Sequence, residues 1–159
     1  MNIRICGIMA SAIFFLATST VAFAQTAGVP AWDTLFAVLA GGNEVSPNGQ
    51  AAAGDPDGHG SATVILHPTT RTLCYAVLVH GIDAPVAAHI HNAPAGRNAP
   101  ILVPLTLTPP AQGNPGNASG CIANLDPALL AAIEQNPGTF YVNVHTAAFP
   151  EGAVRGQLF

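Results

Sequence analysis

The chain has 159 residues, of which 50% are hydrophobic and only 8% charged, and its formal net charge is −4 at pH 7. It contains no lysine, so it lacks the basic footprint that nucleic acids and anionic membrane surfaces require. So few charges on a soluble domain imply a surface made largely of small polar residues, glycine and proline.

The first segment has the pattern of an export signal. Arg4 precedes an apolar run over about residues 8–16, and the sequence AFA ending at Ala24 has the form of a cleavage site. We therefore predict a signal peptide over 1–24, an exported (periplasmic or secreted) protein, and one domain over 25–159. An uncleaved anchor is the alternative, but the apolar run is shorter than a membrane-spanning helix needs.

The remaining sequence predicts short strands separated by turns rich in Gly and Pro. Alternation of apolar and polar residues, or short apolar runs, predict strands at 35–41, 60–67, 71–82, 86–91, 99–107, 139–146 and 152–159. Residues 108–120 predict a polar loop. Asp126 followed by Pro127 predicts the start of one helix, over about 127–135. We expect an all-β Greek-key sandwich or barrel of about 7–8 strands.

Two cysteines remain once the signal, with Cys6, is removed. An even count in an exported domain predicts one disulfide, between Cys74 and Cys121. In the chain-entropy model it would stabilise the fold by roughly 4 kcal/mol. Two buried free thiols are the alternative.

The histidines of two predicted strands share one face. His89 and His91 alternate with apolar Ile90, and His145 alternates with apolar Val144. Residues two apart on a strand are about 6.5–7 Å apart, so two imidazoles can converge on one ion, and a third from a neighbouring strand would complete a site with an open position.

Imidazole nitrogen suits copper, zinc and nickel, and the histidine pattern alone does not choose among them. We expect a copper ion, with zinc possible. Affinity should fall as the pH drops through about 6.5, where imidazoles protonate. His59, on a loop rich in glycine, could swing in as a fourth ligand. The alternative is that all these histidines are polar surface residues.

Several segments together resemble the CHRD domain. They are LFAVLAGGNEVSP, GSATVIL, LCYAVLVHGI, AAHIHNAPAGRNAPILVPL and FYVNVHTAAFPEGAVRGQLF. The resemblance covers about residues 33–159. It also draws attention to Glu44, after the first strand, and Arg155, in the last, which could form a bidentate ion pair that pins the chain ends together.

The CHRD pattern is in turn distantly similar to Cu,Zn superoxide dismutase, a Greek-key barrel with an H-x-H pair. The resemblance implies copper ligands at His89, His91 and His145 and, loosely, a disulfide between Cys74 and Cys121. The segment after the H-x-H pair, residues 92–105, has no histidine and no acid. A zinc site of the dismutase kind is therefore not expected, and efficient dismutation is doubtful.

Three functions follow from these patterns. The first is a non-catalytic exported domain that binds one metal ion through the three histidines. The second is a metal-free module that contacts an envelope or extracellular protein. The third is a copper oxidoreductase that resembles the dismutase. The sequence favours the first, and predicts neither a nucleic-acid partner nor a membrane association after the signal is cleaved.

Overall fold

The structure, a computed structural model, describes residues 33–107 and 116–159, so the predicted signal peptide lies outside the described residues. The strands are β1 (Asp33–Ala40), β2 (His59–His67), β3 (Thr72–His80), β4 (Pro85–Asn92), β5 (Ile101–Leu105), β6 (Gly116–Ile122), β7 (Phe140–Thr146) and β8 (Val154–Gln157). The helices are α1 (Pro127–Gln135) and the short 3-10 turns η1 (Gly41–Asn43), η2 (Pro68–Thr70) and η3 (Pro137–Thr139). Within the described ranges, no helix combines the length and apolar character needed to cross a membrane.

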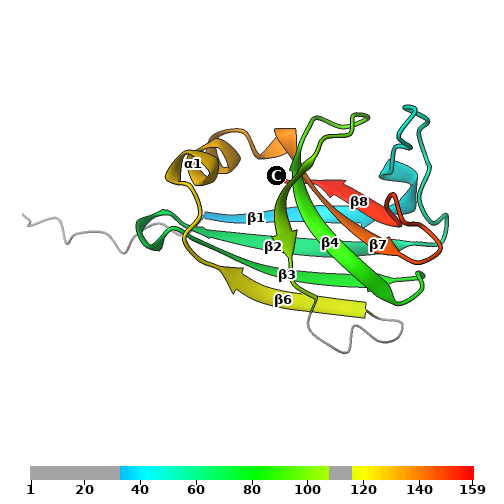
Figure 1. The fold of residues 1–159 in the computed structure, drawn as a ribbon, viewed down its shortest axis with the longest axis horizontal. Helices are drawn as coiled ribbons and strands as arrows, with labels where there is room; N and C mark the ends of the chain where they lie inside the picture. The colour runs from blue at the N-terminus through cyan, green and yellow to red at the C-terminus, as the bar shows by residue number, and fades with distance from the viewer. Residues whose placement is uncertain (1–32, 108–115) are drawn as a thin grey trace, which may run out of the picture.

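The eight strands form one antiparallel sheet that curls into a nearly closed barrel (Figure 1). The strand order is β5-β4-β7-β8-β1-β2-β3-β6, so β4, β8 and β3 each pair with a strand distant in sequence. Apolar side chains of the inward faces fill the barrel. The Tyr75 hydroxyl of β3 donates to the Thr106 carbonyl, just after β5, at 2.7 Å, and so links opposite ends of the sheet. The predicted all-β class, with one short helix, is confirmed.

Strand β6 contradicts the last part, 116–120, of the polar loop predicted over 108–120; residues 108–115 lie outside the described residues. Its sequence, GNASGCI, has little β-propensity and no apolar alternation, so local pattern gives no strand signal. Pairing with β3 holds it, in a register that runs from Leu73 opposite Ile122 to Val79 opposite Gly116. The strand therefore depends on tertiary contacts rather than on its own sequence.

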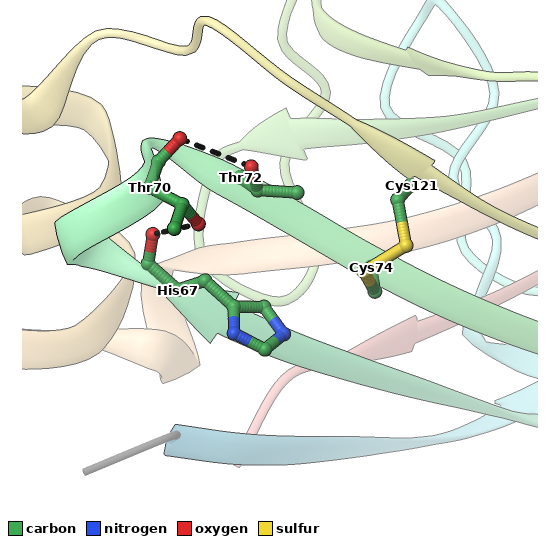
Figure 2. The surroundings of a disulfide bond; sticks show 5 residues. All are labelled: His67, Thr70, Thr72, Cys74 and Cys121. Carbon is green, nitrogen blue, oxygen red and sulfur yellow. Dashed lines mark hydrogen bonds between the residues drawn. A yellow bond between two sulfur atoms is a disulfide. The ribbon is translucent and has the colours of Figure 1, made fainter. Parts of the chain in front are cut away.

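The predicted disulfide joins β6 to β3. Cys74 and Cys121 lie directly opposite each other in the register, and their sulfurs are bonded (Figure 2). Figure 2 also shows the turn η2 between β2 and β3, where the Thr70 hydroxyl donates to the His67 carbonyl and the Thr72 hydroxyl to the Thr70 carbonyl. The disulfide thus covalently holds the edge strand whose sequence least favours pairing.

The predicted helix is confirmed as α1. Its N-cap, Asp126, accepts a hydrogen bond from the Ala128 amide at 2.9 Å, and Pro127 occupies the first helical position. Leu130 and Ile133 are buried and join the barrel core. Figure 1 shows α1 beside the end of the sheet that carries the β2–β3 turn.

A second, smaller buried cluster lies on the outward side of β4, β7 and β8. Inward-facing Val142 and Val144 pack in the barrel, whereas Tyr141 and Asn143 point the other way and are still only 2% and 3% exposed. The chain after β1 and the segment after β4 cover them: the Asn98 side chain donates to the Val45 carbonyl at 2.7 Å, which joins the two covering segments. Because these segments cover it, part of the outward face of β7 is buried like a core.

Candidate metal centre

Three histidine side chains meet on the outward side of β4 and β7. One ring nitrogen from each of His89, His91 and His145 lies within 4.8 Å of the other two. The ring centroid of His89 lies 5.7 Å from that of His91 and 4.9 Å from that of His145. A metal with bonds of about 2.0–2.1 Å spaces its ligand nitrogens by about 3.3–4.2 Å, so small side-chain rotations would close the site.

The register of the β4–β7 pair brings these rings together. His89 pairs with Asn143, His91 with Tyr141, and Ala87 with His145. His145 is therefore the diagonal neighbour of His89 on the same face of two adjacent antiparallel strands. The sequence predicted the shared face, and the structure confirms that β4 and β7 are neighbours.

Backbone carbonyls accept hydrogen bonds from two of these histidine rings. Nδ1 of His91 lies 2.9 Å from the Ala99 carbonyl oxygen, and Nδ1 of His145 lies 2.9 Å from that of Pro150. A carbonyl only accepts, so Nδ1 carries the proton in both rings, and Nε2 of the neutral His145 ring carries the lone pair. A carbonyl acceptor on Nδ1, as at His145, is usual for histidines that bind metals through Nε2.

The other nitrogen of each ring also has a neighbour in the structure. Nε2 of His145 lies 3.0 Å from Nδ1 of His89, so His89 donates the proton that lies between the two rings. Nε2 of His91 lies 3.0 Å from the side-chain oxygen of Asn143, which is also an acceptor, so the structure does not set Nε2 of His91 as a lone-pair donor. A metal at the centre would require the proton of His89 to move to the other nitrogen of its ring and the Asn143 amide to move away.

Burial keeps two of the imidazoles neutral. Desolvation, followed by the charges of His145 and His91, lowers the pKa of His89 to about 4. Desolvation also lowers the pKa of His145, against the opposing effects of the Pro150 carbonyl and Glu151. A lowered imidazole pKa means that these rings need not lose a proton to bind metal at neutral pH. The expected fall in affinity near pH 6.5 therefore shifts to lower pH for these two ligands.

Comparison with known proteins gives the family. The model of the CHRD domain matches residues 35–158. The chain belongs to the CHRD domain family. No curated protein and no solved structure matches the chain.

An aromatic residue and an arginine support the His91 ring of this CHRD domain. The Tyr141 ring stacks on His91 with an interplanar angle of 5° and a centroid distance of 4.7 Å. The Arg155 guanidinium carbon lies 3.4 Å from the Tyr141 ring centroid. The sequence analysis gave Tyr141 and Asn143 no role; the alternation along β7, which puts them on the same face as His145, was the available signal.

The bidentate Glu44–Arg155 pair does not form as predicted. Both side chains are buried, and the Arg155 charge lowers the Glu44 pKa, but burial outweighs it and raises that pKa to about 7. Glu44 Oε1 has no hydrogen-bond partner. The guanidinium instead donates to the side chains of Asn98 and Gln157 and to the carbonyls of Pro94 and Arg97. Arg155 therefore holds the segment after β4 in place over the cluster, because that segment offers three hydrogen-bond acceptors within 3.2 Å of its guanidinium.

The CHRD domain histidines line a cleft with a volume of about 880 Å³. His91 is 5% exposed and lies deepest, while His89 and His145 are half-buried. The site is therefore recessed rather than open to solvent as the strand pattern alone suggested. His59, the suggested fourth ligand, belongs elsewhere: its ring stacks on His80 across the β2–β3 pair, with centroids 5.5 Å apart.

Proposed function

We propose that this CHRD domain is an exported, non-catalytic metal-binding domain that holds one copper ion through His89, His91 and His145. The observation that carries the proposal is the convergence of three imidazole nitrogens, of which that of His145 is already set as a lone-pair donor by the Pro150 carbonyl. Surface histidines without a role need neither this convergence nor the backbone carbonyls that hold two of the rings in place. The cross-strand disulfide supports the exported location, because structural disulfides persist in oxidising compartments.

Copper is preferred to zinc on chemical grounds. Nitrogen sites bind Cu²⁺ more tightly than the other divalent first-row ions. The three-histidine group includes no thiolate and no carboxylate that would favour a different metal. Three protein ligands leave a coordination position open, which suits delivery, storage or sensing of the ion as well as binding of an external ligand.

A second candidate function rests on a different surface. Phe36, Val38 and Phe159 are 48%, 65% and 65% exposed, and the two phenylalanine rings lie 6.3 Å apart. Val38 and Phe159 also line one shallow cleft. Large exposed apolar side chains that gather in this way are typical of protein-binding surfaces. In this second function the domain binds no metal, and the surface contacts an envelope or extracellular protein.

Calorimetric titration of the disulfide-bonded domain with Cu²⁺ and Zn²⁺, in competition with a chelator of known affinity, tests the metal proposal. We expect one Cu²⁺ per chain, weaker Zn²⁺ binding, and loss of both in the His89→Gln/His91→Gln variant. His59→Gln is the matched control, since it removes an exposed imidazole outside the group. Copper binding that survives the double substitution, or that His59→Gln abolishes, would refute the proposal and leave the apolar surface as the better candidate.

A further inference from the structure

The cleft over the three histidines has a floor and two walls. Its floor is the outward side of β4 and β7. One wall is the segment from Asn98 to Ile101, before and into β5, and the other is the β7–β8 connection from Ala147 to Glu151. Each wall holds one histidine, because His91 donates to Ala99 in the first and His145 to Pro150 in the second. Any group that reaches a metal at the floor must therefore lie between the two walls.

Apolar aliphatic side chains make up half of this lining. Among them are Val86, Ala87, Pro100, Ile101, Ala147 and Pro150. Val86 and Ile101 are 60% and 54% exposed, which is high for large aliphatic side chains beside a cleft. Burying them under a ligand would be favourable at roughly 25 cal/mol for each Å² of apolar surface removed from water.

The charge of the lining disfavours a simple anion. Glu151 is the one residue with a formal charge among those that line the cleft. A small anion would gain attraction from the metal alone and would meet the Glu151 carboxylate, whereas a neutral donor would not. The volume of about 880 Å³ is also far larger than a small inorganic ion needs and falls within the range of pockets for small organic molecules.

We propose that the cleft binds a neutral organic molecule with an apolar ring body and one nitrogen donor, which takes the open coordination position of the metal. The inference rests on the metal site proposed above and names the class of ligand that the site accepts. The nitrogen lone pair coordinates the ion between the histidines, and the ring body lies between the walls against Ile101, Val86 and Pro150. No bond is made or broken other than the coordinate bond.

The test compares three probes on the Cu²⁺-loaded domain: 4-phenylimidazole, imidazole and azide. Binding is followed by the shift of the copper visible and paramagnetic resonance spectra. The same probes are measured on copper diethylenetriamine, a small chelate with three nitrogen ligands, an open position and no cleft. We expect 4-phenylimidazole to bind the protein about tenfold more tightly than imidazole once both affinities are normalised to the chelate, and azide to bind more weakly than either.

Variants of the wall show whether the cleft causes this preference. Ile101→Ser and Val86→Ser should each reduce the preference for 4-phenylimidazole severalfold and leave the affinity for imidazole and for copper unchanged. Leu102→Ser is the matched control, because Leu102 is also on β5 and 41% exposed but does not line the cleft. All three side chains are exposed, so the substitutions should not unfold the domain.

The outcomes separate this inference from the metal site itself. Copper binding with the same ratio of probe affinities as the free chelate would overturn the ligand class and leave the metal proposal intact. A preference for azide, or an equal effect of Leu102→Ser and Ile101→Ser, would overturn it as well. Absence of stoichiometric copper binding would refute both the metal site and its ligand.

Discussion

Glu44→Gln should stabilise the domain at alkaline pH and leave its stability nearly unchanged in acid. The Glu44 side chain is 2% exposed, and burial raises its pKa from 4.5 to about 7 although Arg155, the Val45 amide and the Asn143 side chain act in the opposite direction. Between these two values the folded protein keeps a proton that the unfolded chain has released. The free energy of unfolding contributed by this group is therefore fully present below about pH 4.5 and decreases as the pH rises through 7.

The size of the effect follows from the two pKa values. A difference of about 2.5 pH units, at about 1.4 kcal/mol for each, amounts to roughly 3 kcal/mol of stability lost in the wild type by pH 8.5. Glutamine has nearly the shape of the protonated carboxyl and does not titrate. The variant should therefore exceed the wild type by less than about 1 kcal/mol at pH 5 and by up to about 3 kcal/mol at pH 8.5.

Urea unfolding at pH 5, 7 and 8.5, followed by tyrosine and tryptophan fluorescence, measures this difference directly. Other acids titrate in both proteins, so their contributions cancel when the variant is subtracted from the wild type. Asp83→Asn is the control for removing an exposed carboxylate. A Glu44→Gln difference that is constant with pH, or that grows toward acid, would show that the buried carboxyl is ionised throughout and would refute the reasoning.

Three further predictions concern the histidines, the disulfide and a glycine. Between pH 7.5 and 5.5, protonation of an ordinary imidazole ligand lowers copper affinity about tenfold. Because the pKa of His89 is lowered to about 4, the total loss of copper affinity over this range should be at least tenfold smaller than for three ordinary imidazoles. Competition with a chelator at each pH measures the affinity. Replacing Cys74 and Cys121 by serine should lower the free energy of urea unfolding by roughly 4 kcal/mol, given a sequence separation of 47, without changing copper stoichiometry. Gly152→Ala should lower the melting temperature, because the φ of Gly152 is +140° and a Cβ there would lie 2.5 Å from the buried Glu44 carboxylate. Gly138→Ala is the control and should not lower it, because the space around Gly138 is open. Equal melting temperatures of the two variants would argue against the packing of Gly152 on Glu44.

Local pattern predicted most of the barrel. Residues of strands such as β2 and β7 alternate between the core and the outward face, so the period of two residues located these strands. The N-cap Asp126 located the start of α1. Strand β6 could not be located because its Gly, Asn and Ser residues carry no period, and only its partner β3 and the disulfide hold it. The disulfide itself followed from counting cysteines in a chain predicted to be exported.

Local pattern also predicted part of the histidine site. Alternation placed His89, His91 and His145 on one face, but it could not show that His91 would be 5% exposed. That burial arises from segments far away in sequence, such as the contact of Asn98 with the Val45 carbonyl. The raised pKa of Glu44 and the hydrogen bonds of Arg155 to the segment after β4 are long-range effects of this kind, so the predicted bidentate pair was wrong in its geometry.

The measurement that tests the central claim most directly is paramagnetic resonance of the domain loaded with one equivalent of Cu²⁺, with and without ¹⁵N-labelled histidine. We predict one copper species per chain with hyperfine coupling to three imidazole nitrogens, and loss of one of these couplings in each of His91→Gln and His145→Gln. A spectrum with fewer imidazoles, or one that neither substitution alters, would contradict a three-histidine metal centre in this CHRD domain.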